Sequence, residues 1–177
     1  MLKKLTVDQF DPIYHIMEKS FPRDERRPRE EQLALFGLDC YQVFGMTDQK
    51  GTVIAFIAIW DLESVVFIEH FAVSPEYRNG GIGGQMLREL IQMLHKDVCL
   101  EVEPPDTDLA RRRIAFYERN GFFFNAYDYF QPPLSKGQEI VPLRIMTSEG
   151  KVSRERFEEL KGFLYRFVYE VEETQML

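Results

Sequence analysis

The 177-residue sequence has few cysteines, no long apolar run and no signal-type hydrophobic segment. Its two cysteines, Cys40 and Cys99, lie in apolar strand-like surroundings and form no metal-ligand spacing with the three histidines, so we expect two reduced core thiols and no metal. The longest uninterrupted apolar run, residues 53–60, is far too short to cross a bilayer. Because Lys3 and Lys4 are followed by Leu5-Thr6-Val7-Asp8 rather than by the apolar stretch of a signal peptide, we expect a cytoplasmic protein with no membrane partner.

The chain also lacks an excess of positive charge. It has 29 acidic and 22 basic residues, which gives a formal net charge of −7 at pH 7. Basic residues cluster locally, as in residues 23–29 and 111–113, among acidic neighbours, whereas nucleic-acid-binding proteins more often carry positive charge over a whole face. We therefore expect no nucleic-acid partner. Excess acid is compatible with a cationic substrate, although general solubility explains it more simply.

Apolar residues make up 45% of the sequence, which is enough for a core, and no linker or repeat divides it. We therefore predict one domain over residues 1–177. Apolar periodicity predicts alternating strands and helices of an α/β fold. The expected strands cover 2–5, 39–46, 53–60, 64–73, 98–103, 122–130 and 139–146. The expected helices cover 7–20, 29–36, 82–94, 109–119 with Asp108 as N-cap and Gly121 as stop, and the segment from 152, whose end at 172–177 should fray.

The most informative segment is Arg78-Asn79-Gly80-Gly81-Ile82-Gly83-Gly84, which lies between a buried strand pattern and the start of a helix. Four glycines in five positions leave backbone N–H groups uncovered, in a turn that admits positive φ at the electropositive end of a helix. Such a turn predicts a phosphate-binding site. From the glycines alone, a flexible surface turn that binds nothing is the simpler alternative.

Two common phosphate-binding motifs do not fit this segment. A P-loop ends in Lys followed by Ser or Thr, whereas Gln85 and Met86 follow Gly84 here. A dinucleotide fingerprint would need a third glycine in place of Met86, and an acidic residue at a distance where the chain has none. What remains is an Arg-x-x-Gly-x-Gly pattern formed by Arg78, Gly81 and Gly83.

This pattern resembles that of the GNAT superfamily of N-acetyltransferases. A second segment, Tyr117-Glu118-Arg119-Asn120-Gly121-Phe122, is similar to the Tyr-x-x-x-Gly-Phe motif of the same family, and the two motifs stand in the family's order. The resemblance covers most of the chain, and least the part beyond about residue 148. It implies a single-domain α/β GNAT fold, with a mixed central sheet of about seven strands and helices on both faces.

The resemblance also implies a function, which is acetyl transfer from the cosubstrate acetyl-coenzyme A to a primary amine by direct attack in a ternary complex, without a metal. The acceptor would be a small molecule or a peptide. In the family the glycine segment wraps the pyrophosphate, and the strand before it supplies a backbone N–H to the acetyl carbonyl. The cofactor-binding residues implied are Phe71, Ala72, Val73, Arg78, Asn79, Gly80, Gly81, Ile82, Gly83 and Gly84.

Acetyl transfer requires an acid for the leaving thiolate and a base for the amine, because an ammonium with a pKa near 10 cannot attack. Tyr117 matches the acid of the family, and a core tyrosine is its alternative explanation. Glu69, which interrupts an apolar strand, is the candidate base acting through a water; its alternative is a carboxylate paired with a structural arginine. His70 is the reserve base, because only a bulge would bring it to the same face as Glu69.

One position departs from the family pattern. Many relatives carry an asparagine where this chain has Ala110, so the corresponding contact with the pantetheine arm is not expected. This absence keeps a second function open, namely a non-catalytic coenzyme-A-binding regulatory or interaction module. The charged segment Phe21–Pro28 is either a lid over the acceptor or a solvated loop. The apolar C-terminal helix could pair with a second copy in a homodimer.

Overall fold

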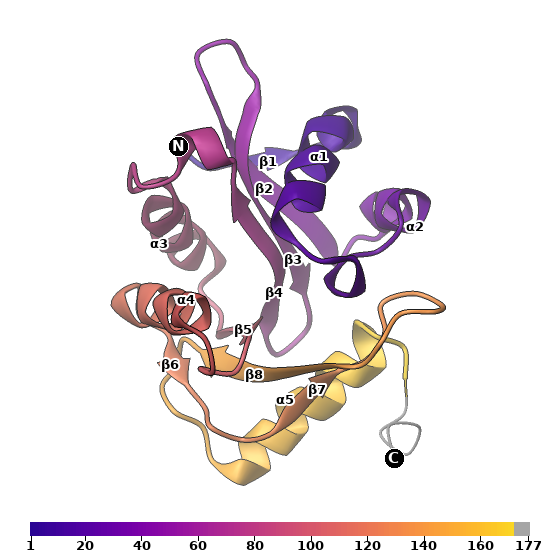
Figure 1. The fold of residues 1–177 in the computed structure, drawn as a ribbon, viewed down its shortest axis with the longest axis vertical. Coiled ribbons are helices and arrows are strands. Elements are labelled where there is room, and N and C mark those ends of the chain that lie inside the picture. The colour runs from indigo at the N-terminus through magenta and orange to yellow at the C-terminus, as the bar shows by residue number, and fades with distance from the viewer. Residues whose placement is uncertain (172–177) are drawn as a thin grey trace. The chain divides into compact units, whose positions relative to one another are not determined.

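The computed structural model describes residues 1–171 and divides the chain into two compact units, residues 1–96 and 97–177 (Figure 1). The end predicted to fray, 172–177, lies outside the described residues. The single domain predicted over residues 1–177 stays a prediction, and each unit is described by itself.

The first unit is an antiparallel sheet with helices on both faces. Figure 1 shows α1 and α2 on one side of this sheet and α3 on the other. Each strand pairs with the next in the order β1 (Lys3–Leu5), β2 (Tyr41–Thr47), β3 (Val53–Asp61) and β4 (Val66–Val73). The helices are α1 (Phe10–Ser20), α2 (Arg29–Ala34) and α3 (Ile82–Leu94).

The core of this unit forms around β3. Every residue from Val53 to Trp60 is buried. This confirms the prediction, made from the continuous apolar run, of a central strand that is covered on both faces. The helix expected over 7–20 begins later, at Phe10, because residues 7–9 form a separate 3₁₀ turn. There the Gln9 side chain accepts a hydrogen bond from the Thr6 backbone N–H at 2.9 Å, which fixes the chain before α1.

The second unit is built around β8, which pairs antiparallel with three other strands. Figure 1 shows α4 and α5 on opposite sides of these strands. The strands are β5 (Val98–Val102), β6 (Phe123–Phe124), β7 (Tyr129–Gln131) and β8 (Val141–Thr147), and the helices are α4 (Asp108–Arg119) and α5 (Arg154–Phe167).

Two local predictions for the second unit are wrong. The strand expected over 122–130 is interrupted, because the buried Asn125 side chain donates to the Ile145 carbonyl and to Thr147 Oγ1 and so competes with a regular ladder. The N-cap of α4 is Thr107, whose Oγ1 accepts from the Ala110 N–H at 3.1 Å. The stop at Gly121 is confirmed, since its φ is +90°.

The two cysteines are free thiols. Cys99 is buried in β5, and burial raises the pKa of its thiol, as expected of an inert core residue. Cys40 is only half-buried, so its prediction as a core residue is wrong. Among residues 1–171, no cluster of His, Cys, Asp and Glu could hold a metal ion. No helix in this part of the chain is long and apolar enough to span a bilayer.

Gly45 marks a close approach between three strands and provides a test of this packing. A Cβ at Gly45 would lie 2.5 Å from Leu5 Cδ1 and 2.6 Å from the Ala55 carbonyl oxygen. We predict that Gly45→Ala lowers the free energy of unfolding by about 1–3 kcal/mol, measured by urea denaturation. Gly37→Ala is the control, because no atom lies within 4 Å of that added methyl group. An equal loss of unfolding free energy in the two variants would show that the close approach at Gly45 does not determine the effect.

Candidate functional site

The glycine turn joins β4 to α3 and has a left-handed backbone at two positions. After a 3₁₀ turn over Pro75–Tyr77, Asn79 has a φ of +66° and Gly81 a φ of +78°. Gly81 is the N-cap of α3 and offers no side-chain acceptor to the N–H groups of the first helical turn. Left-handed turns of this kind turn backbone N–H groups outward, and the helix dipole adds positive potential, so this geometry suits an anion.

Arg78 ties this turn to the end of β4. Its Nε donates to the Val73 carbonyl at 2.9 Å, and the next residue, Ser74, donates its N–H to the Ile54 carbonyl of β3 at 2.8 Å. Because backbone groups alternate in direction along a strand, the Val73 backbone faces away from β3. Only residues 74–77 separate the segment Phe71–Val73 from the turn 78–84, both of which are expected to bind the cofactor, and the bond from Arg78 to Val73 links the two.

A β-bulge in β4 determines how Glu69 and His70 are oriented. Ala58 of β3 pairs with His70, and Ile59 pairs with Ile68, so Glu69 is an extra residue without a partner in the register. In a regular strand the two side chains would point to opposite faces. Here Glu69 Oε2 and His70 Nδ1 lie 3.3 Å apart, and both side chains are buried. The bulge therefore brings the two candidate bases together.

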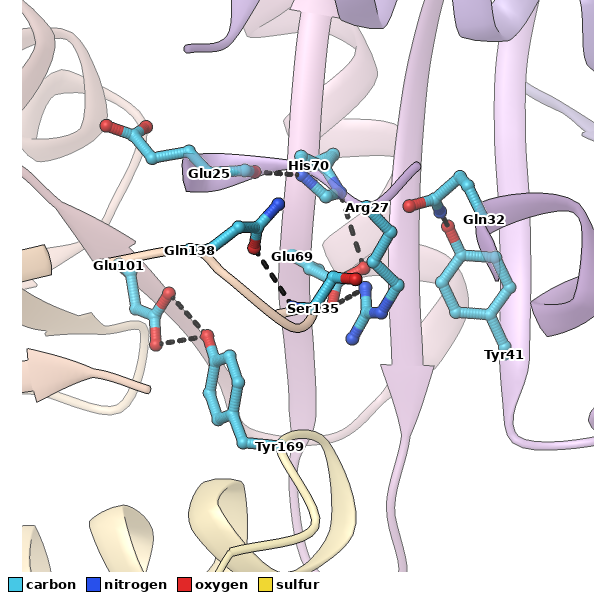
Figure 2. A network of polar contacts seen from close by, with 10 residues as sticks. All are labelled: Glu25, Arg27, Gln32, Tyr41, Glu69, His70, Glu101, Ser135, Gln138 and Tyr169. Atoms are coloured by element: carbon cyan, nitrogen blue, oxygen red, sulfur yellow. Dashed lines mark hydrogen bonds and ion pairs between the residues drawn. The ribbon is translucent and has the colours of Figure 1, made fainter. Parts of the chain in front are cut away.

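The carboxylate of Glu69 forms a buried ion pair with Arg27. Arg27 Nη1 lies 2.7 Å from Glu69 Oε1, and the exposed fractions of the two side chains are 8% and 3% (Figure 2). Burial by itself raises the pKa of Glu69, but the charge of Arg27 and the contacts with His70 outweigh it and lower the pKa to about 2. Glu69 is therefore ionised at neutral pH and is a weak proton acceptor.

His70 contacts the segment between α1 and α2. Its Nε2 lies 2.7 Å from the Glu25 carbonyl oxygen, which can only accept, so the hydrogen of this contact is on Nε2. The other ring nitrogen, Nδ1, faces the Glu69 carboxylate, and no described residue gives it a hydrogen bond. Both nitrogens of His70 are thus directed at named neighbours.

Tyr117, the candidate acid, belongs to α4 in the second unit. Its ring is half-buried and lies against Phe116 and Phe122, with ring centroids 5.3 and 5.9 Å away. Burial raises the pKa of its phenol to about 12, although the charge of Arg113 lowers it in part. The phenol consequently keeps its proton at neutral pH, and the raised pKa makes it a weaker acid than a free tyrosine. Ala110 is buried in the same helix and offers no polar side chain.

Two residues with buried or multiple polar contacts, Arg27 and Glu101, were not among the predicted site residues. Arg27 lies in a segment with several arginines, and nothing in the sequence distinguishes it from its neighbours. Glu101 of β5 accepts hydrogen bonds from the hydroxyls of Tyr129, at 2.5 Å, and Tyr169, at 2.7 and 2.8 Å. Figure 2 shows the contacts with Tyr169. Glu101 interrupts an apolar strand as Glu69 does, and this pattern could have indicated it.

The pKa of Glu69 leads to a prediction about stability in acid. Because the pKa is lower in the folded state than in the unfolded chain, the ion pair stabilises the fold above about pH 4.5 and loses its effect as the pH falls to about 2. We predict that Glu69→Gln removes this acid-dependent loss, which amounts to about 3 kcal/mol, in urea unfolding at a series of pH values. Glu18→Gln, at an exposed position paired with Arg26, should keep the loss of the parent protein. If the free energy of unfolding of Glu69→Gln fell with decreasing pH as steeply as that of the parent protein, the prediction would be contradicted.

Comparisons with known proteins found similar proteins that are named as acetyltransferases. The chain is 32% identical to a GNAT-family structure from Bacteroides thetaiotaomicron, provisionally named an acetyltransferase, with a TM-score of 0.85 over 97% of this chain and 99% of that chain. It is 27% identical over 111 residues to YjbC of Bacillus subtilis strain 168, also provisionally named an acetyltransferase. That match covers 62% of this chain and just over half, 55%, of the length of YjbC.

A more distant structure shares the fold alone. YncA of Salmonella typhimurium, described with its cofactor acetyl-CoA, is 17% identical, with a TM-score of 0.61 over 83% of this chain and 91% of that chain. Residues 10–122 match the acetyltransferase (GNAT) family. The predicted fold class, an α/β GNAT fold, is confirmed by these similarities. The chain belongs to the GNAT acetyltransferase family.

Proposed function

We propose that the protein transfers an acetyl group from acetyl-coenzyme A to a primary amine, by direct attack of the amine in a ternary complex. The observation that carries this proposal is the turn between β4 and α3, in which the left-handed Gly81 leaves the first helical N–H groups without a side-chain cap. The family matches support acetyl transfer in general. The acceptor is a small molecule or a peptide in this proposal, and the homodimer stays a prediction.

The residues around the turn fit a pyrophosphate. The N–H groups of Ile82, Gly83 and Gly84 begin α3, and the exposed Arg78 precedes them in the same turn. The backbone of Phe71–Val73 leads into the turn and would lie along the acyl end. When bound, the coenzyme supplies an activated acetyl thioester.

We assign the proton transfers to three side chains. Tyr117 donates a proton to the leaving thiolate in close contact, as the carbon–sulfur bond breaks, because a phenol with a pKa of about 12 is protonated at neutral pH but is a weak acid. His70 takes the amine proton through a water on Nδ1, the ring nitrogen that receives no hydrogen bond from a described residue. Glu69 stabilises the resulting positive charge from 3.3 Å, since its pairing with Arg27 makes the carboxylate itself a poor base. Removing either Glu69 or His70 would therefore impair the same step.

The coenzyme site is tested by Gly81→Glu. A glutamate at position 81 would place a negative charge at the start of α3. Its Cβ would also strain the left-handed backbone that Gly81 adopts. We therefore predict that coenzyme A binding, measured by calorimetry, weakens by at least about 100-fold. Gly51→Glu is the matched control, because Gly51 is also exposed with a φ of +82° but lies in the β2–β3 hairpin. If Gly81→Glu bound coenzyme A as well as the control, the site assignment would be wrong.

The acid is tested by Tyr117→Phe. We predict that thiol release from acetyl-coenzyme A in the presence of an accepted amine falls by about 100-fold, while coenzyme A binding stays within about twofold. Tyr165→Phe removes another tyrosine hydroxyl, one that donates to the Phe130 carbonyl at 2.6 Å, and is expected to keep activity. A broad panel of amines, peptides and aminoglycosides identifies the accepted amine. Binding of coenzyme A without turnover across the panel would instead favour the non-catalytic module.

A further inference from the structure

We propose that Arg27 is a positioning residue: through its ion pair with Glu69 it holds the segment Phe21–Pro28 on the bulge of β4, and it thereby sets how tightly the acceptor amine binds. The part about the acceptor rests on the proposed function. The part about the segment rests only on contacts within the first unit.

The segment is held on the bulge at three points. Near its start, the Phe21 ring lies edge-on to the His70 ring, with centroids 4.8 Å apart. In its middle, the Glu25 carbonyl contacts His70 Nε2 at 2.7 Å, and near its end Arg27 contacts Glu69 at 2.7 Å (Figure 2). Because these contacts span the segment, it is a docked element rather than a solvated loop.

Arg27 itself is fixed from several directions. Its guanidinium lies over the Trp60 ring, 5.8 Å from the centroid, and its backbone carbonyl accepts from the Tyr14 hydroxyl at 3.2 Å. Arg29, two residues further, is different: its ion pair with Asp11 is exposed, with side-chain exposed fractions of 53% and 79%. A buried pair that loses one partner leaves an uncompensated charge, whereas an exposed pair contributes little. The two arginines therefore form a matched comparison.

The ion pair gives Glu69 a structural task in addition to its place beside His70. The bulge directs Glu69 and His70 together toward the segment, and each holds one part of it. The glycine turn has separate anchors, namely the bond from Arg78 to the Val73 carbonyl and the bond from Ser74 to Ile54. Because the segment lies on His70, which takes the amine proton in the proposed function, its release should alter acceptor binding and leave coenzyme A binding intact.

The test compares Arg27→Met with Arg27→Lys and with the control Arg29→Met. We expect Arg27→Met to speed hydrogen exchange of the amides at 23–27 at least about tenfold. It should also raise the KM for the acceptor by at least about tenfold, while coenzyme A affinity stays within about twofold of the parent protein. Arg27→Lys keeps the charge that pairs with Glu69 but loses the planar group over Trp60, so its exchange rate and KM should lie closer to those of the parent protein than the values of Arg27→Met do. Arg29→Met should match the parent protein.

Because Arg27→Met leaves a buried carboxylate unpaired and could unfold the protein, the double variant Arg27→Met/Glu69→Gln removes both charges. It should fold, bind coenzyme A and still show fast exchange at 23–27. Exchange as slow as in the parent protein would overturn the proposal, and so would an unchanged acceptor KM in a variant with fast exchange. Failure of the parent protein to bind coenzyme A would refute the proposed function instead, and exchange would still decide the role of Arg27.

Discussion

Glu69 is a charged residue in an otherwise apolar strand, and it can be buried there because the Arg27 guanidinium lies 2.7 Å from its carboxylate. The bulge in β4 makes this pairing possible, since it turns Glu69 and His70 to the same side. The segment Phe21–Pro28 then closes over both residues with its own backbone and with Arg27. The polar arrangement of the first unit thus depends on one ion pair and one extra residue.

The same strand connects this polar group to the anion-binding geometry. β4 carries the bulge at Glu69 and ends at Val73, whose carbonyl accepts from Arg78 in the glycine turn. A strand that is anchored to β3 on both sides of a bulge is a rigid support, and rigid supports are what precise positioning of reacting groups requires. The proposed chemistry and the proposed cofactor site therefore share one element of the fold.

The second unit stabilises its carboxylate in a different way. Glu101 accepts hydrogen bonds from the hydroxyls of Tyr129 and Tyr169, where Glu69 pairs with an arginine. Burial and the nearby charge of Glu101 raise the pKa of Tyr129, so that this hydroxyl remains a donor. Neutral donors hold a carboxylate without cancelling its charge. The two glutamates that interrupt apolar strands therefore lie in electrostatically different surroundings.

The sequence by itself determined the order of strands and helices, the glycine turn before α3 and the family, because periodicity and turn chemistry act over a few neighbouring residues. It misplaced the N-cap of α4 and the strand at 122–130, where Thr107 and Asn125 form side-chain bonds to the backbone. Only the tertiary structure decided that Glu69 and His70 share a face and that Arg27 is the partner of Glu69. A bulge depends on pairing with another strand, and this ion pair joins residues 42 positions apart, so neither leaves a local signal in the sequence.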